Sequence, residues 1–315
     1  DTSFVTLTNS GTEVARLQLT HSNPVMKNNE NRFLTYGIGS ASYEISSFDE
    51  TLYSGNAENK IYTGDVASNG TYCLVTEDNG YLTTLYAYSK NNNRIYKYSF
   101  SEYYITSVAI NKDGSGCVAT GVSSDKGSAV TGVYVLDFSQ EKPVSTYKIS
   151  GDSVLDCKYL TSDTAVLVGS QASYIVKKGE KNYKTVSYED KTLSNYCFNT
   201  DTSTYTMALS RSGDGRSVAL ISYNSNGEAQ YTINTEHKAD SLSVYKGTVA
   251  ILDGNVVYGY NQNGDLLYST NSGTGSKKIV LASDYTAYIL SVNQIRFIDL
   301  DSVSSDDTAQ TSKQE

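Results

Sequence analysis

Residues 105–149 read ITSVAINKDGSGCVATGVSSDKGSAVTGVYVLDFSQEKPVSTYKI, and this stretch contains a unit that the rest of the chain repeats. Four segments, ITSVAI, CVATGVS, GVYVLDFS and PVSTYKIS, alternate apolar and polar residues and are joined by short polar turns. Alternation with a period of two is typical of a β-strand, and Asn, Asp and Gly suit tight turns. The stretch therefore predicts four short antiparallel strands.

Five further segments have the same pattern of four strands and short turns. They are residues 24–54, 61–100, 153–188, 193–233 and 242–270. Four antiparallel strands in about 40 residues are typical of a propeller blade. No segment has the i, i+3, i+4, i+7 apolar spacing of an amphipathic helix. The sequence therefore predicts an all-β propeller.

The two ends of the chain are incomplete repeats. Residues 276–301 supply three strands, and residues 1–22 supply two. Propellers commonly complete one blade with strands from both termini, because an unpaired sheet edge promotes aggregation. We expect a single domain over residues 1–301 with seven four-stranded blades, the closing blade being shared by the two ends; eight blades are the alternative. Residues 302–315 are polar and acidic and are expected to be disordered.

Charge and hydropathy exclude several classes of partner. The chain has 315 residues and a net charge of −9, and its Lys and Arg residues are scattered singly. Nucleic acids and anionic lipids bind clustered basic residues, so we expect neither as a partner. The sequence contains no apolar run of 18 residues, and we expect no membrane span within it.

Four cysteines, Cys73, Cys117, Cys157 and Cys197, are spaced about one repeat apart. None forms a CxxC pair, so the spacing does not favour a zinc ribbon or a thioredoxin-like motif. Positions that recur with the repeat are core positions, and we expect buried thiols there. A disulfide between Cys117 and Cys157 is the alternative.

The sequence contains no recognisable catalytic or metal-binding motif. His21 and His237 are the only histidines, and both are expected in exposed loops. Neither has the neighbours of a zinc site or of a Ser-His-Asp triad, and no Gly-rich phosphate loop is present. We therefore expect no metal, no cofactor and no catalytic residue.

Asp65 and Asp156 are candidate binding residues because both lie in predicted innermost strands of their blades. Carboxylates there line a solvated channel or accept hydrogen bonds from the backbone. A pair of carboxylates at the mouth of the channel would also suit a glycosidase.

Tyrosine is the one compositional oddity, with 28 Tyr and no Trp. Its flat ring and hydroxyl suit contacts with sugars or proteins, although most of these residues are expected within blades. The connection SEYY at residues 101–104 joins two blades, where propellers usually place ligand contacts. We predict a binding patch at Glu102, Tyr103 and Tyr104, with Tyr81 as a further candidate.

Three stretches of the chain resemble a family of bacterial β-propellers of unknown function, found in Gram-positive anaerobes. They are NGTYCLVTEDNGY (69–81), FSEYYITSVAINKDGSG (100–116) and VYVLDFSQEKPV (133–144). The blades are also similar to quinoprotein-type and tryptophan-aspartate-repeat propellers, without the Trp-Asp dipeptide. The resemblance implies a propeller outside the cell, tethered by an N-terminal transmembrane anchor that this sequence does not include. It implies no catalytic residues.

These observations favour a non-enzymatic extracellular binding module, a monomer that presents a propeller face to a protein or a cell-wall glycan. A carbohydrate-active enzyme with carboxylates at the channel mouth is one alternative. A scaffold subunit of a cell-envelope complex is the other, because propellers serve many functions.

Overall fold

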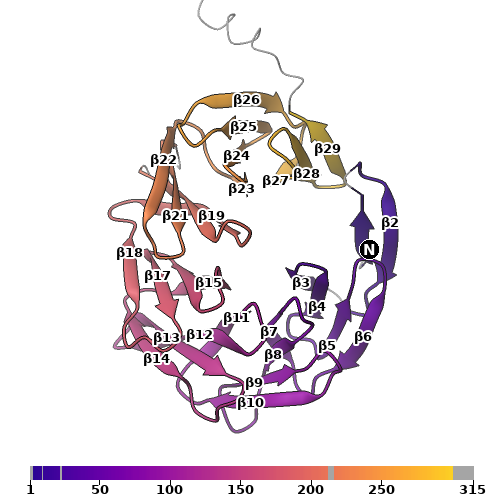
Figure 1. Cartoon of the computed structure of the whole chain (residues 1–315), viewed down its shortest axis with the longest axis vertical. Coiled ribbons are helices and arrows are strands. Elements are labelled where there is room, and N and C mark those ends of the chain that lie inside the picture. Colours follow the sequence, from indigo (N-terminus) through magenta and orange to yellow (C-terminus); the bar gives the residue numbers. More distant parts are fainter. Residues whose placement is uncertain (1–2, 9, 22, 212–215, 301–315) are drawn as a thin grey trace, which may run out of the picture. The chain divides into compact units, whose positions relative to one another are not determined.

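The computed structural model describes residues 3–8, 10–21, 23–211 and 216–300. Within these residues the protein contains 29 β-strands, numbered β1 to β29, and no helix (Figure 1). The same residues accordingly include no helix that is long and apolar enough to cross a membrane.

Six sheets are four-stranded antiparallel meanders in which strands pair in chain order, and we name them blades 1 to 6. Blade 1 contains β3 (Pro24–Asn29), β4 (Arg32–Gly37), β5 (Ser42–Ser46) and β6 (Thr51–Asn56). Blade 2 contains β7 (Ile61–Val66), β8 (Tyr72–Thr76), β9 (Thr83–Tyr88) and β10 (Arg94–Phe100). Blade 3 contains β11 (Tyr104–Ile110), β12 (Gly116–Asp125), β13 (Ser128–Asp137) and β14 (Ser145–Ser150).

The remaining strands continue the same order. Blade 4 contains β15 (Val154–Tyr159), β16 (Thr164–Gly169), β17 (Ala172–Lys177) and β18 (Lys184–Ser187). Blade 5 contains β19 (Thr192–Asn199), β20 (Thr204–Ser210), β21 (Val218–Asn224) and β22 (Ala229–Thr235). Blade 6 contains β23 (Ser241–Tyr245), β24 (Thr248–Asp253), β25 (Val256–Tyr260) and β26 (Leu266–Asn271). The N-terminal hairpin is β1 (Ser3–Leu7) and β2 (Glu13–Gln18), and the C-terminal sheet is β27 (Ser276–Leu281), β28 (Thr286–Ser291) and β29 (Ile295–Asp299).

These boundaries confirm the six predicted repeats and fit a count of about seven blades. The N-terminal hairpin and the C-terminal strands are assigned to two different hydrogen-bonded sheets. A closing blade shared between them therefore stays a prediction. Strands β1–β18 belong to one compact unit, the first unit, and strands β19–β29 to a second. The single domain over residues 1–301 also stays a prediction, and the tail at 302–315 lies outside the described residues.

In blades 2 and 3 of the first unit the second and third strands are largely buried on both faces, because each of these blades has a neighbour on either side. All five residues of β8, YCLVT, are buried, whereas β14 alternates between buried or half-buried and exposed positions. Strands covered on both faces read as continuous apolar runs. In the first unit, separate clusters of buried side chains fill the spaces between blades 1 and 2, 2 and 3, and 3 and 4. Each fully buried Leu or Val contributes about 1.5–3 kcal/mol.

The order of the strands decides which side chains reach the surface of the first unit. The first strands β3, β7, β11 and β15 lie on the inner side of the curved row of blades (Figure 1). The fourth strands β6, β10, β14 and β18 lie on the outer side. Residues of neighbouring fourth strands therefore share one outer surface, although a whole repeat separates them in the sequence.

The cysteines fall into two pairs, and the members of each pair occupy equivalent strands of successive blades. Cys73 and Cys117 lie in second strands, and Cys157 and Cys197 in first strands. Cys73, Cys117 and Cys157 are buried, whereas Cys197 is half-buried. All four are free thiols, so no bond joins Cys117 to Cys157. Burial raises the pKa of the Cys157 thiol to about 12, which keeps it protonated at neutral pH.

Candidate functional site

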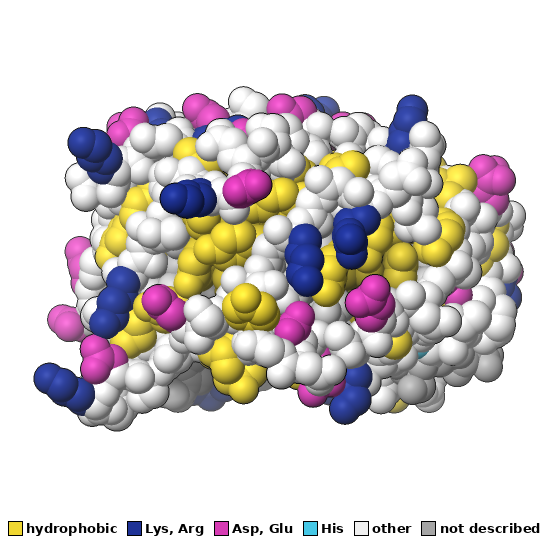
Figure 2. Space-filling model, turned by 90° about the horizontal axis from the view of Figure 1, so that it is seen from below, with side chains coloured by type: hydrophobic (Ala, Val, Ile, Leu, Met, Phe, Trp, Pro, Cys, Tyr) yellow, Lys and Arg dark blue, Asp and Glu magenta, His cyan; other side chains and the backbone are white. Residues whose placement is uncertain are grey.

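A groove of about 480 Å³ lies between the fourth strands of blades 2 and 3, on the outer side of the first unit. We call it the tyrosine groove. Figure 2 shows hydrophobic side chains, tyrosines included, gathered on the face that includes β10, with single charged side chains among them. The groove is lined by Tyr98, Ser99, Phe100, Ser101, Glu102, Tyr103, Tyr134, Thr146, Tyr147 and Lys148.

One wall follows from the alternation of β10. Residues two apart in a strand point to the same side, so Tyr98 and Phe100 share a face. Phe100 is buried and packs edge-to-face on Tyr134 of β13, with ring centroids 4.9 Å apart. Tyr98 packs edge-to-face on Phe100, also at 4.9 Å, and is only half-buried. The buried ring thus positions the accessible one.

A glycine in β13 makes room for Tyr103 in the connection between blades. A Cβ added at Gly132 would lie 2.5 Å from a carbon of the Tyr103 ring. The ring therefore lies directly over the glycine, and it packs edge-to-face against Tyr134 at 6.1 Å. This contact anchors the connection from β10 to β11 and holds Glu102, the preceding residue, at the groove.

Residues of β14 form the opposite wall. The Tyr147 hydroxyl donates a hydrogen bond to the carbonyl oxygen of Glu180 at 2.6 Å, and its ring packs edge-to-face on Tyr183 at 5.7 Å. Lys148 Nζ donates to Asp125 Oδ2 at 3.0 Å. The hydrogen bond and ring contact of Tyr147 therefore position its side chain before any ligand arrives, whereas Lys148 forms only an exposed ion pair.

The polar groups at the centre of the groove are not paired with one another. Within the described residues, the Glu102 carboxylate and the hydroxyls of Tyr98 and Tyr103 have no hydrogen-bond partner. Burial raises the pKa of Tyr98 and of Tyr134, and the negative charge of Glu102 adds to the effect. The phenols of Tyr98 and Tyr134 consequently remain protonated at neutral pH, beside the Glu102 carboxylate.

This chemistry suits binding better than catalysis. Among the described residues that line the groove, Glu102 is the only one with a carboxyl group, and neither His nor Cys is present. Most glycoside hydrolases require two carboxyl groups at a defined separation. The groove instead offers aromatic faces for stacking, hydroxyl donors and one acceptor.

The structure places two of the six predicted binding residues, Glu102 and Tyr103, in the tyrosine groove. Tyr104 begins β11 with 53% of its surface exposed, and it does not line the groove. Tyr81, 51% exposed, lies in the connection between β8 and β9 and is also outside the lining. Both tyrosines are exposed, and neither lines the groove, so binding at these two residues stays a prediction.

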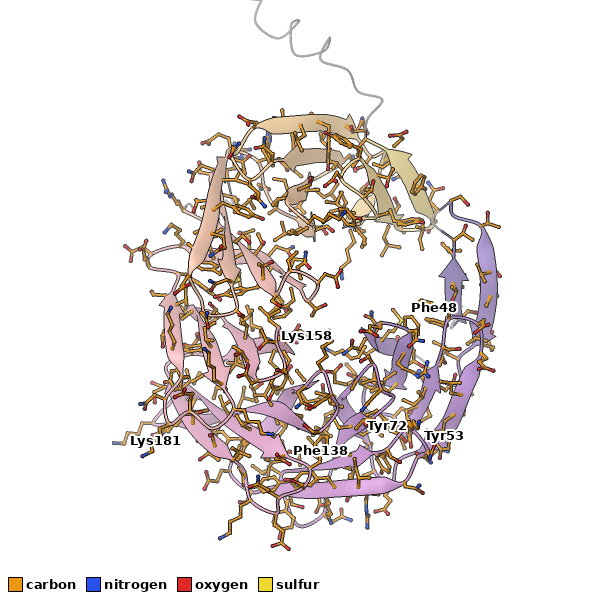
Figure 3. All side chains as sticks on the ribbon, in the orientation of Figure 1. Phe48, Tyr53, Tyr72, Phe138, Lys158 and Lys181 are labelled. Atoms are coloured by element: carbon orange, nitrogen blue, oxygen red, sulfur yellow. The ribbon has the colours of Figure 1, made fainter. Side chains whose placement is uncertain are left out.

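Asp65 and Asp156 lie in the first strands β7 and β15, as predicted, away from the groove. Asp65 is only 2% exposed, and its Oδ2 accepts a hydrogen bond from the Ile110 amide of blade 3 at 2.9 Å. Burial raises the pKa of Asp65, although the positive charge of Lys158, labelled in Figure 3, opposes this. Asp156 is half-buried, with Oδ1 3.8 Å from Lys27 Nζ. The burial of Asp65 favours a structural role over the predicted contact with a ligand.

His21 is buried, with 4% of its surface exposed, so the expectation of an exposed loop is wrong for this residue. The cause is the preceding residue, since the Thr20 amide and hydroxyl donate to Glu44 Oε1 at 3.2 and 3.1 Å and draw the segment onto β5. Burial lowers the pKa of His21. His237 is half-buried and stacks on Tyr258 at 3.5 Å. Across the described residues, no group of three His, Cys, Asp or Glu side chains is placed to hold a metal ion.

Sequence reasoning missed Tyr98, Tyr134 and Tyr147 as members of the groove. They come from two different blades and read as ordinary blade tyrosines. The alternation of RIYKYSF in β10 carries a signal, because it puts Tyr98 on the same face as Tyr96 and Phe100, the face that packs toward blade 3. Nothing in the sequence shows that β10 and β14 face one opening together.

Fold and site together define a class of protein, a β-propeller with a tyrosine-lined groove in its first unit. The chain belongs to DUF5711, a family of unknown function, whose model matches residues 3–300. No curated protein matches the sequence.

Several solved structures are similar to this chain. The C-terminal WD40 domain of Sif2 has a TM-score of 0.61 and 15% identity, with 86% of this chain and 79% of that chain covered. BamB from Moraxella catarrhalis has a TM-score of 0.64 and 11% identity, with 92% and 86% covered. Hsv2 from Kluyvelomyces marxianus has a TM-score of 0.59 and 10% identity, with 91% and 95% covered. At these identities the similarity confirms the propeller fold alone.

Proposed function

We propose that this protein is a non-enzymatic binding module, and that the tyrosine groove holds a segment of a protein partner. The observation that carries the proposal is the unpartnered Glu102 carboxylate among accessible tyrosine rings. Tyr and Arg dominate the energetics of protein interfaces, and a carboxylate pairs most strongly with an Arg or Lys of the partner. Walls that are fixed before binding lower the entropy cost of association.

A cell-wall glycan is the second candidate ligand. The same rings offer flat apolar faces to a sugar, while the free hydroxyls and the carboxylate match the hydroxyl groups of its ring. The two candidates differ in what they require of Glu102. A basic peptide depends on its charge, whereas a neutral glycan depends on its hydrogen-bonding oxygens.

Peptide and glycan arrays probed with the purified chain separate the two candidates. For the ligand so identified, we expect Tyr103→Ala to weaken binding by about 30-fold or more, as for a buried aromatic anchor. Glu102→Gln should weaken a basic peptide strongly and a neutral glycan little. Tyr81→Ala is the control, because Tyr81 is an exposed tyrosine of the same unit that lies outside the groove.

Two results would contradict the proposal. One is binding of the array ligand by Tyr103→Ala with wild-type affinity, provided that the variant melts at the wild-type temperature. The other is turnover of a substrate in a hydrolase panel that Glu102→Gln abolishes, because a single carboxylate would then act in catalysis.

We also propose that the module is a monomer that works outside the cell, tethered by an N-terminal anchor. The resemblance of its central repeats to surface propellers supports the location, and the groove lies wholly within the first unit of one chain. Protease treatment of intact cells that produce the natural protein tests the location. Light scattering of the purified chain tests the monomer.

A further inference from the structure

A second pocket, of about 260 Å³, lies between blades 1 and 2 of the first unit. It opens at one end of the blades. This end carries the turns that join the first strand to the second and the third strand to the fourth. We call it the cationic pocket, and Figure 3 labels two of its tyrosines, Tyr53 and Tyr72. Its lining consists of Arg32, Ile45, Leu52, Tyr53, Gly70, Tyr72, Lys90, Asn91 and Asn92.

Two cations from different blades converge on this pocket. Arg32 begins β4 of blade 1, and Lys90 lies in the turn between β9 and β10 of blade 2. Both side chains line the pocket beside Gly70, where an added Cβ would lie 2.9 Å from Lys90 Cβ and 3.7 Å from Arg32 Nε. Bringing two positive charges together is unfavourable unless an anion compensates them.

Neither cation is paired with a carboxylate of the described residues. Among the described residues, neither Arg32 nor Lys90 lies within ion-pair distance of a carboxylate. The Arg32 guanidinium donates only to the carbonyl oxygen of Asn31, at 3.2 Å. The described residues that line the pocket include no carboxylate, although the chain as a whole has a net charge of −9. The pocket is therefore locally positive in an acidic protein.

Hydrogen bonds beneath the pocket fix its third donor. Tyr72 is buried, and its hydroxyl shares a 3.1 Å hydrogen bond with the Tyr43 hydroxyl. The Tyr72 hydroxyl also donates to Asn92 Oδ1, so the amide NH₂ of Asn92 remains available as a donor. Stacking of Tyr72 on Tyr88, with centroids 5.0 Å apart, holds this floor in place.

The pocket thus combines a guanidinium, an ammonium and an amide donor with an apolar side formed by Ile45 and Leu52. We propose that it binds a small anionic molecule whose carboxylate or phosphate group sits between Arg32 and Lys90. The guanidinium matches the two oxygens of such a group in a bidentate geometry, and the ammonium adds charge. The volume of the pocket lies below the usual range for drug-sized ligands. It suits a ligand about as large as one sugar ring that carries the anionic group.

Calorimetric titration tests this site with three named probes, glucose 6-phosphate, glucuronate and neutral glucose. We expect millimolar or tighter binding of at least one anionic probe and none of glucose. Arg32→Gln and Lys90→Gln should each weaken the anion by at least about tenfold, the effect of losing one charge-assisted hydrogen bond. Which probe binds distinguishes a phosphate from a carboxylate ligand.

Lys142→Gln is the matched control, because Lys142 is an exposed cation of the first unit outside the pocket. It should bind the anion as the wild type does. The proposal fails if neither anionic probe binds the wild type. It also fails if binding survives in the doubly substituted Arg32→Gln, Lys90→Gln chain, which would place the anion elsewhere. A rise in melting temperature with the anion, absent in both single variants, gives a second readout.

The cationic pocket is independent of the tyrosine groove. Tyr103→Ala should leave anion binding unchanged, since Tyr103 does not line this pocket. Failure of one site to bind therefore leaves the other proposal standing.

Discussion

Asp65 shows how one side chain joins two blades. Its Oδ2 accepts the hydrogen bond of the Ile110 amide across the junction, while its Oδ1 is buried without a partner. An ionised carboxylate in this setting lacks solvation, which is why burial raises its pKa. A neutral side chain of the same shape avoids that cost.

We expect Asp65→Asn to be at least as stable as the wild type near pH 8. Asp65→Ala should lower the free energy of unfolding by about 1–3 kcal/mol, because the Ile110 amide is left unpaired. The folded pKa of Asp65 is raised, so its stabilising contribution is complete below the unfolded value and declines as pH rises through the folded value. Urea unfolding near pH 5 and near pH 8 gives the free energy of unfolding of both chains. The free energy of unfolding of Asp65→Asn, relative to that of the wild type, should increase with pH. A gain that is the same at both pH values would contradict it.

At the scale of the element, β13 shapes the tyrosine groove through a residue that has no side chain. Gly132 lies in the middle of a buried strand, where Gly normally weakens a sheet. Here it lets the Tyr103 ring lie against the strand, so the groove depends on a close approach to the backbone.

Gly132→Ala should push the Tyr103 ring out of its place while blade 3 stays folded. The colliding atoms belong to a side chain at the surface, so displacement of the ring relieves the clash. We expect nitration of Tyr103 by tetranitromethane, followed by peptide mass mapping, to become several-fold faster. Gly80→Ala is the control, because the nearest atom to an added Cβ there is 3.7 Å away. Equal nitration rates in Gly132→Ala and the wild type would show that the glycine does not position the ring.

At the scale of the whole molecule, tyrosines replace tryptophan as the large aromatic residues of the core. Burial raises the pKa of many of them, among them Tyr72, Tyr96, Tyr134, Tyr159, Tyr174 and Tyr268. Because the folded pKa values are raised, their contribution to stability is complete below the unfolded value near 10 and declines above it.

The melting temperature should therefore stay level between about pH 7 and pH 9 and fall steeply above about pH 10. A spectrophotometric titration of the native chain should show exposed phenols ionising first and the rest only as the protein unfolds. The guanidinium-unfolded chain is the control, with all phenols ionising together near 10. Reversible ionisation of every phenol near pH 10 in the native chain would contradict the burial.

Much of this architecture follows from the sequence alone, because a blade is a local structure. Alternation and Gly-Asn-Asp turns predicted six repeats whose limits agree with the observed sheets to within a few residues, and the repeat spacing predicted buried thiols, as observed at Cys73, Cys117 and Cys157. The SEYY connection was also predicted as a binding patch, and three of its four residues, Ser101, Glu102 and Tyr103, line the groove, where binding stays a prediction. Each of these features depends on neighbours in the same repeat.

Tertiary structure decided what depends on contacts between repeats. The sequence could not show that β10 and β14 border one groove, or that Arg32 and Lys90 line one pocket. Nor could it show that Asp65 is buried and hydrogen-bonded to the next blade. It also misplaced His21, whose burial comes from the hydrogen bonds of Thr20 to Glu44. Periodicity shows which side of a strand a residue occupies, whereas only the packing of one blade on another decides what that side faces.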